Sequence, residues 1–184
     1  MLNLTKLMVM NINRSYNQLV GLLLIIYIIH NLEEWFLFRL KISEIIKVIP
    51  EGIKGCIGND QHILVTLFCI AIIIATVIPM VVAIFIWNKP TKLNAKILLV
   101  AGLVTLVNGI SHISSSFIIG TFSPGFITGV ILCIPYGIMA FEFFRRNYPI
   151  SLLNYLLLGL LTIGLFFGGI ASIWGLAYIA ISLF

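Results

Sequence analysis

Residues 17–38 read NQLVGLLLIIYIIHNLEEWFLF, a long apolar run that ends among polar side chains. A transmembrane helix needs about 20 consecutive, mainly apolar residues, and this stretch meets that length. Lys6 and Arg14 precede it, as basic residues precede the apolar core of a signal peptide. The run continues into charged residues, however, and no small-residue cleavage site follows it. We therefore predict a retained membrane span.

Four further stretches have the same character, so the chain is predicted to be an all-α integral membrane helical bundle with about five transmembrane helices. The expected spans are residues 17–38, 63–87, 95–119, 125–144 and 151–183. Pro79 is expected to kink the second span, and Pro135 lies within the fourth. The fifth stretch is too long for one upright helix and too short for two, and Gly168-Gly169 is a candidate kink or break within it. A break there would raise the count to six.

The composition agrees with a membrane location. Apolar residues make up 61% of the 184 residues and charged residues only 9%, with a mean hydropathy of +1.16. Soluble domains are about 45–50% apolar and about 25% charged. A soluble domain, a disordered chain and a nucleic-acid-binding protein are therefore excluded. We expect residues 1–184 to form a single transmembrane domain with the lipid bilayer as partner. The cysteines Cys56, Cys69 and Cys133 form no CxxC pair and are interpreted as apolar filling.

The distribution of basic residues predicts the orientation. With five spans, one side of the membrane receives Lys6, Arg14, Lys89, Lys92, Lys96, Arg145 and Arg146. We predict a multi-pass protein of the cell membrane. Because Lys and Arg collect in cytoplasmic loops, its N-terminus is predicted to be cytoplasmic. The long first connection disagrees, since Arg39, Lys41, Lys47 and Lys54 fall on the other side.

The same connection, residues 40–61, has an apolar face. Ile42, Ile45, Ile46 and Ile49 share one side of a helix in this spacing. The pattern predicts an interfacial amphipathic helix between the first two spans. It is either a plain surface helix or a lid over a site beneath it.

The first span ends in the polar sequence His30-Asn31-Leu32-Glu33-Glu34. Residues three and four positions apart share a helix face, so His30, Glu33 and Glu34 are predicted to point the same way. Ionisable side chains inside a span are costly, and each is a candidate functional residue. One imidazole and two carboxylates could bind a divalent metal such as zinc, iron or manganese. They could also exchange protons with water without a metal.

A second polar group lies on the third span, where Asn108 and His112 are four residues apart. At about 1.5 Å per residue, His30 lies roughly 12 Å from the end of its span and His112 roughly 10 Å from the end of its own. Both spans run in the same direction, so both groups are expected in the same membrane layer. We predict one joint site, formed by His30, Glu33, Glu34, Asn108 and His112. The candidate metal ligands are His30, Glu33, Glu34 and His112.

Other residues near the spans have simpler expected roles. Gly109 is expected to allow close helix contact, and Thr128 lies within a turn of the outer end of the fourth span and could line the site. Glu142 is interpreted as a boundary ion pair with the neighbouring Arg145 and Arg146 rather than as a site.

Three classes of function remain open on these residues. The first is an enzyme in which the site binds a metal or activates water for a hydrophobic or lipid-like substrate. The second is a carrier coupled to protons or cations, and the third is a non-catalytic protein whose polar cluster only fastens helices together. Five spans without an inverted repeat are an unusual basis for a carrier, so transport ranks below catalysis. No nucleotide-binding or haem-attachment motif is present.

Several of these residues together resemble a known family. His30-x-x-Glu33-Glu34 is followed by Asn108-x-x-x-His112, by the Pro124-Gly125 turn and by Pro135. In this order the residues resemble the HXXEE family of small multi-pass membrane proteins, and the resemblance covers residues 18–144. It implies an integral membrane protein with a site at these positions. It implies no particular reaction.

Overall fold

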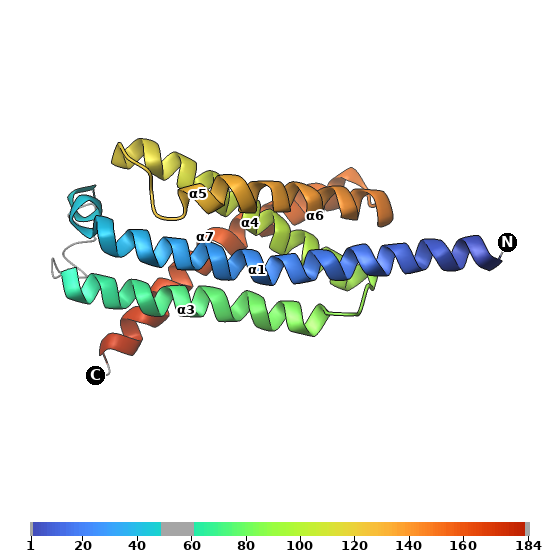
Figure 1. Ribbon diagram of the computed structural model, residues 1–184, viewed down its shortest axis with the longest axis horizontal. Coiled ribbons are helices and arrows are strands. Elements are labelled where there is room, and N and C mark those ends of the chain that lie inside the picture. The colour runs from blue at the N-terminus through green and yellow to red at the C-terminus, as the bar shows by residue number, and fades with distance from the viewer. Residues whose placement is uncertain (1, 49–60, 183–184) are drawn as a thin grey trace.

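The computed structural model describes residues 2–48 and 61–182, and every regular element in these ranges is helical (Figure 1). The helices are α1 (Leu2–Val48), α3 (Gln61–Ile86), α4 (Lys92–Ile119), α5 (Phe126–Thr128), α6 (Ile134–Asn147) and α7 (Leu152–Ser182), with a π-helical turn η1 (Gly129–Cys133) between α5 and α6. Five helical segments in the described ranges are long and apolar enough to cross a membrane, and α5, η1 and α6 form one of them. The predicted number of helices with spanning length and apolar character is confirmed for the described residues.

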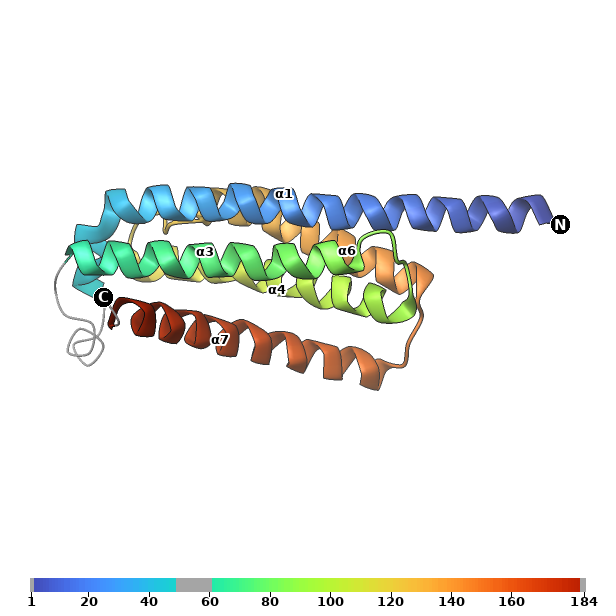
Figure 2. The same cartoon turned by 90° about the horizontal axis from the view of Figure 1, so that it is seen from below.

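The long helices lie side by side along the length of the molecule (Figures 1 and 2). α1 packs on α3, α4 packs on α6, and α7 lies against α3 and α4. The N-terminal part of α1 extends well beyond the ends of the other helices. Large apolar side chains such as Phe85, Ile84 and Leu160 are exposed on the outside. An apolar exterior of this kind suits contact with lipid rather than with water.

The core lies between α1, α4 and α6. Tyr16, Leu23, Leu98, Tyr136 and Phe144 are almost completely buried there, together with Cys133. The Tyr16 hydroxyl donates to the carbonyl oxygen of Ile86 at 3.0 Å, and the Tyr136 hydroxyl donates to that of Leu19 at 3.1 Å. Buried hydroxyls need such partners, so these two tyrosines fix the position of α1 against α3 and α6.

Glycines bring α4 and the segment from η1 to α6 into close contact. A Cβ atom added at Gly102 would lie 2.5 Å from the Ala140 Cβ, and one added at Gly137 would lie 2.4 Å from the Leu106 Cβ. A Cβ at Gly109 would lie 2.7 Å from the carbonyl oxygen of Gly129. The expected close contact at Gly109 is therefore confirmed. Small residues at helix interfaces are the usual means of tight packing in membranes.

Pro135 is accommodated by the π-helical turn η1. Proline has no N–H group, so Pro135 cannot donate the usual hydrogen bond to the residue four positions earlier. The preceding turn widens instead, and the N–H of Ile134 bonds to the carbonyl oxygen of Gly129, five residues back. Such π-turns are frequent at functional sites. Here the turn lies directly after Thr128, which contacts the candidate site.

The structure corrects one expectation about helix boundaries and decides another point that the sequence left open. Residues 40–48 do not form a separate interfacial helix, because they continue α1, whose last turns bend away from its axis (Figure 2). Their isoleucine face is covered by protein: Ile42 is buried beside Leu64, and Ile45 and Ile46 pack on the same cluster. The remainder of the expected interfacial segment, residues 49–60, lies outside the described residues. The fifth span is one continuous helix, α7, without a break at Gly168-Gly169.

Candidate functional site

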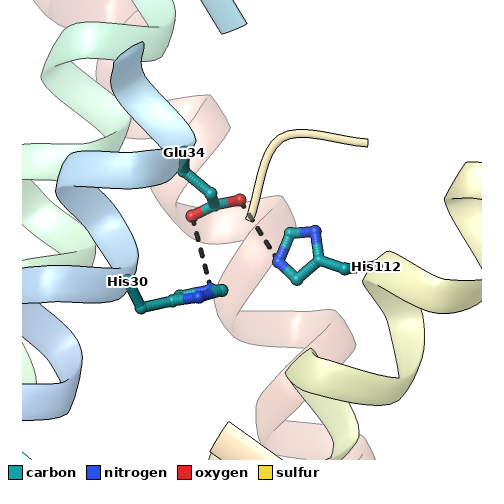
Figure 3. A group of neighbouring side chains, drawn as sticks. All are labelled: His30, Glu34 and His112. Atoms are coloured by element: carbon teal, nitrogen blue, oxygen red, sulfur yellow. Dashed lines mark ion pairs between the residues drawn. The ribbon is translucent and has the colours of Figure 1, made fainter. Parts of the chain in front are cut away.

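Glu34 lies between the two histidines that the sequence predicted to come together (Figure 3). Its Oε2 atom is 3.9 Å from His30 Nε2, and its Oε1 atom is 3.4 Å from His112 Nε2. The two imidazole rings meet edge to face, with centroids 4.9 Å apart. One ligand atom from each side chain lies within 4.8 Å of the others. We refer to His30, Glu34 and His112 as the His/Glu group.

The His30 ring is held through both of its nitrogens. Nδ1 is 2.7 Å from the Thr128 hydroxyl oxygen, and Nε2 is 2.8 Å from the side-chain nitrogen of Asn108. An amide nitrogen is only a donor, so Nε2 accepts this hydrogen bond and Nδ1–H donates to Thr128. The arrangement leaves Nε2 unprotonated, which is the form that binds a metal. Because Asn108 uses that lone pair, an ion could bind there only if the amide moved aside.

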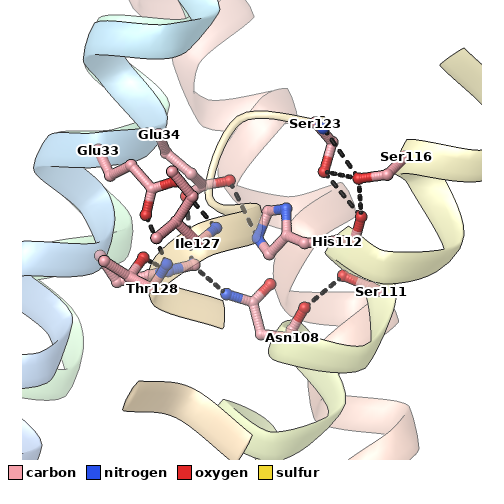
Figure 4. A network of polar contacts seen from close by, with 10 residues as sticks. Glu33, Glu34, Asn108, Ser111, His112, Ser116, Ser123, Ile127 and Thr128 are labelled. Carbon is pink, nitrogen blue, oxygen red and sulfur yellow. Dashed lines mark hydrogen bonds and ion pairs between the residues drawn. The ribbon is translucent and has the colours of Figure 1, made fainter. Parts of the chain in front are cut away.

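His112 has a different environment. Its Nε2 atom is buried and, among the described residues, has no hydrogen-bond partner, although it faces Glu34. The backbone at His112 is firmly held, since its carbonyl oxygen accepts hydrogen bonds from the hydroxyls of Ser116 at 2.7 Å and Ser123 at 2.8 Å (Figure 4). A buried polar atom without a partner costs about 1–3 kcal/mol. The His112 Nε2 atom, which makes no hydrogen bond although Glu34 Oε1 lies 3.4 Å away, is therefore the feature of this site that most needs an explanation.

Glu33 is not part of the His/Glu group, and its carboxylate binds backbone. Its Oε1 accepts the N–H of Ile127 at 3.1 Å, and its Oε2 accepts the N–H of Thr128 at 2.7 Å (Figure 4). These N–H groups belong to the first turn of α5, where helical N–H groups lack partners within the helix. Glu33 thus fixes the segment that carries Thr128, and Thr128 in turn contacts His30 of the His/Glu group.

Replacing Glu33 by glutamine is expected to lower the free energy of unfolding by about 1–3 kcal/mol, because an amide has one acceptor oxygen and leaves one of the two N–H groups unpaired. Thermal unfolding in mild detergent measures the loss. Glu44→Gln is the matched control, since it removes a carboxylate from an exposed position of the same helix. Equal unfolding midpoints for the two variants would contradict the bracing role of Glu33.

The turn before α5 closes over the His/Glu group. Gly125 has a φ of +80°, in the left-handed region that favours glycine. A Cβ atom there would lie 2.8 Å from the Glu34 Cγ and 2.8 Å from the His112 Cε1. Lys41 holds the same turn from the end of α1, since its Nζ donates to the Thr121 hydroxyl at 3.0 Å and to the Phe122 carbonyl oxygen at 2.6 Å.

The structure brings together most of the residues named from the sequence. His30, Glu34 and His112 form the group, Asn108 and Thr128 contact its first member, and Glu33 supports Thr128 through the backbone. The expected contribution of Thr128 and the ion pair of Glu142 with Arg145 and Arg146 are both confirmed. The sequence did not predict the roles of Gly125 and Ser123. The only signal for them was the Ser-Pro-Gly sequence, which indicates a turn before the fourth span.

The fold and the candidate site together indicate the class of protein: a helical bundle with five described helices long and apolar enough to cross a membrane, and a histidine–glutamate group within it. A family model described as "protein of unknown function with HXXEE motif" matches residues 21–140. The chain belongs to this HXXEE family, as predicted, and His30, Glu33 and Glu34 supply the motif. No curated protein and no solved structure matches the chain.

Proposed function

We propose that the protein is a metal-dependent membrane enzyme in which His30, Glu34 and His112 bind one divalent cation. The observation that carries the proposal is the His/Glu group itself: three side chains from two helices present ligand atoms within 4.8 Å of one another. Two imidazoles and one carboxylate are the protein ligands of several catalytic zinc sites and of non-haem iron sites. Zinc is the first candidate, and iron and manganese are the others.

The Nε2 atom of His112 favours a bound ion over a purely structural cluster, because it is buried and faces the Glu34 carboxylate at 3.4 Å without making a hydrogen bond in the described residues. A cluster that only fastened helices together would gain from satisfying every buried polar atom. His30 already has two hydrogen-bond partners, and Glu34 alone could join α1 to α4. An ion between the three side chains would bind the His112 nitrogen, which makes no hydrogen bond in the described residues.

The surroundings of the His/Glu group suit a catalytic metal. Three protein ligands would leave a coordination position for water, and a zinc ion held by them would lower the pKa of that water toward neutrality. Thr128 fixes the orientation of the His30 ring from the far side, as partners of metal-binding histidines commonly do. Because the group lies within helices that can span a membrane, the substrate class that fits is a hydrophobic or lipid-like molecule.

The basic residues support a cytoplasmic N-terminus in the cell membrane as part of this proposal. One end of the bundle carries six basic residues. They are Arg14 near the start of the bundle, Lys89 after α3, Lys92 and Lys96 in the first turns of α4, and Arg145 and Arg146 in the last turn of α6. Lys41, which disagreed with this orientation, is hydrogen-bonded to the turn beside the site. The His/Glu group would then lie toward the outer leaflet.

Metal content tests the proposal. The full chain, produced with zinc, iron and manganese supplied and purified in mild detergent, is expected to hold about one ion per chain, the number that a single three-ligand site binds. His30→Ala, His112→Ala and Glu34→Gln are each expected to lose it. His62→Ala and Glu44→Gln are the matched controls, and both are expected to retain the ion because neither residue is in the group.

Two results would contradict the metal proposal. One is wild-type protein that is folded and monodisperse but binds no ion after all three metals have been supplied. The other is loss of the ion from the His62→Ala control to the same extent. If the wild type binds no ion while Glu34→Gln remains folded, the metal-free acid–base site or a proton-coupled carrier becomes the leading interpretation. Proton movement in sealed vesicles then separates those two.

A further inference from the structure

An open groove of about 1090 Å³ lies between α1 and α6, near the point where α3 ends. Its lining comes from residues 14–25 of α1, Trp87, and residues 139–147 of α6. These segments adjoin the opposite ends of the spans from those that carry the His/Glu group. The groove is therefore separate from that group, and a ligand bound in it would be independent of the proposed metal site.

The two helices that line the groove change from polar to apolar in the same direction. On α1, Arg14 and Gln18 lie at the outer end, and Leu22 and Ile25 lie deeper along the same face. On α6, which runs the opposite way, Met139 and Phe143 lie inside and Arg146 lies at the outer end. Each set is spaced by three or four residues, so it follows one helix face. The groove thus has a charged mouth and an apolar interior.

The mouth carries an excess of positive charge. Arg146 is paired with Glu142 at 3.1 Å, and the same carboxylate accepts two hydrogen bonds from Arg145. No carboxylate of the described residues pairs with Arg14, which is exposed. Two arginines and one glutamate line the groove, so its net charge is positive. Basic pockets between transmembrane helices at a membrane surface are suited to anionic lipid headgroups.

The wall of the groove is built by specific contacts. Gly21 lets the Trp87 ring approach α1, since a Cβ atom at Gly21 would lie 3.2 Å from that ring. Next to it, the Asn17 side chain donates to the Asn88 side chain at 2.6 Å and accepts the Asn88 N–H at 3.1 Å. Tryptophan is the residue typical of the membrane–water boundary. Trp87 therefore marks the level at which a lipid headgroup would lie.

We propose that this groove binds one phospholipid with an anionic headgroup. The phosphate lies against Arg14 and Arg146, and an acyl chain follows Leu22, Ile25 and Met139 into the bilayer. Charge complementarity at the mouth and the apolar interior below it both select this occupant. A soluble phosphate compound would use the mouth alone and would leave the apolar interior unused.

Retention of lipid by the purified full chain tests this proposal. The protein is equilibrated in detergent with equal amounts of dioleoyl phosphatidylglycerol and dioleoyl phosphatidylcholine, and the bound lipid is measured by native mass spectrometry. The wild type is expected to retain phosphatidylglycerol preferentially. Each of Arg14→Gln and Arg146→Gln is expected to reduce that preference about five-fold, the effect of one basic residue near a membrane surface.

Two further variants keep the test specific. The double variant Lys89→Gln/Lys92→Gln removes two positive charges from the same end of the bundle outside the groove, and it is expected to keep the wild-type preference. Met139→Trp fills the apolar interior without changing the charge, and it is expected to reduce retention of both lipids. Circular dichroism and size-exclusion profiles confirm that each variant is folded.

Three outcomes would overturn the proposal. The wild type retains both lipids equally; the Lys89→Gln/Lys92→Gln variant loses the preference as much as the arginine variants; or glycerol 3-phosphate displaces the bound lipid. The second outcome indicates diffuse surface charge, and the third indicates a phosphate site without a chain-binding part. None of the three bears on the metal content of the His/Glu group.

Discussion

Gly125→Ala is expected to disturb the His/Glu group more than any other glycine-to-alanine substitution in the turn before α5. Two effects add. A left-handed backbone costs an alanine about 1–2 kcal/mol. In addition, the new methyl group would lie 2.8 Å from both the Glu34 Cγ and the His112 ring, and overpacking of this kind costs about 1–3 kcal/mol.

Gly120→Ala separates these two effects. Gly120 also has a left-handed backbone, with a φ of +73°, but a Cβ atom there meets nothing within 4 Å. The Gly120→Ala variant is therefore expected to lose only the free energy that the left-handed backbone costs an alanine. We expect thermal unfolding in detergent to give a clearly lower midpoint for Gly125→Ala than for Gly120→Ala, and the metal content to fall only in Gly125→Ala. Equal midpoints and equal metal content would show that the turn does not press on the group.

Gly137→Ala is expected to separate α4 from α6. Its methyl group would lie 2.4 Å from the Leu106 Cβ and 2.7 Å from the backbone carbonyl oxygen of Gly102. A backbone atom cannot turn aside as a flexible side chain can, so the helices must move apart. The expected loss is about 1–3 kcal/mol in the free energy of unfolding, the usual cost of forced overpacking. The unfolding midpoint in detergent measures it.

Gly159→Ala is the control for the helix position. Gly159 lies on α7, and a Cβ atom added there meets nothing within 4 Å. Since alanine is favoured over glycine within a helix by roughly 0.5–1 kcal/mol, this variant is expected to be neutral or slightly more stable. If Gly137→Ala were as stable as Gly159→Ala, the close approach of α4 and α6 would not be needed for stability.

The spans could be predicted because a bilayer imposes length and apolar character on each of them. Their ends could not. Hydropathy falls at Arg39, yet α1 continues to Val48, because the isoleucine face of residues 42–46 finds partners on α3 around Leu64. An amphipathic pattern indicates that one face is buried, and it does not say whether lipid or protein covers that face.

The candidate site, like the spans, was predictable only in part. Helical spacing placed His30 and Glu34 on one face, and equal depth brought His112 to them. The same spacing rule placed Glu33 with them, whereas the structure turns its carboxylate to the backbone N–H groups of α5. Those N–H groups belong to a turn whose position depends on Gly125 and Ser123, and no periodic pattern in the sequence encodes that position.

The hydrogen bonds of His30 have a consequence for biosynthesis. The residue is synthesised before its two partners, Asn108 and Thr128, which lie 78 and 98 residues further along the chain on other helices. Until synthesis has passed Thr128, the imidazole lacks both of these hydrogen-bond partners. A nascent chain that stops after the second span would therefore carry an unsatisfied polar segment, which the insertion machinery or another membrane protein would have to shelter. Once the fourth span has been completed, the polar segment would have its own partners and would no longer need that protein.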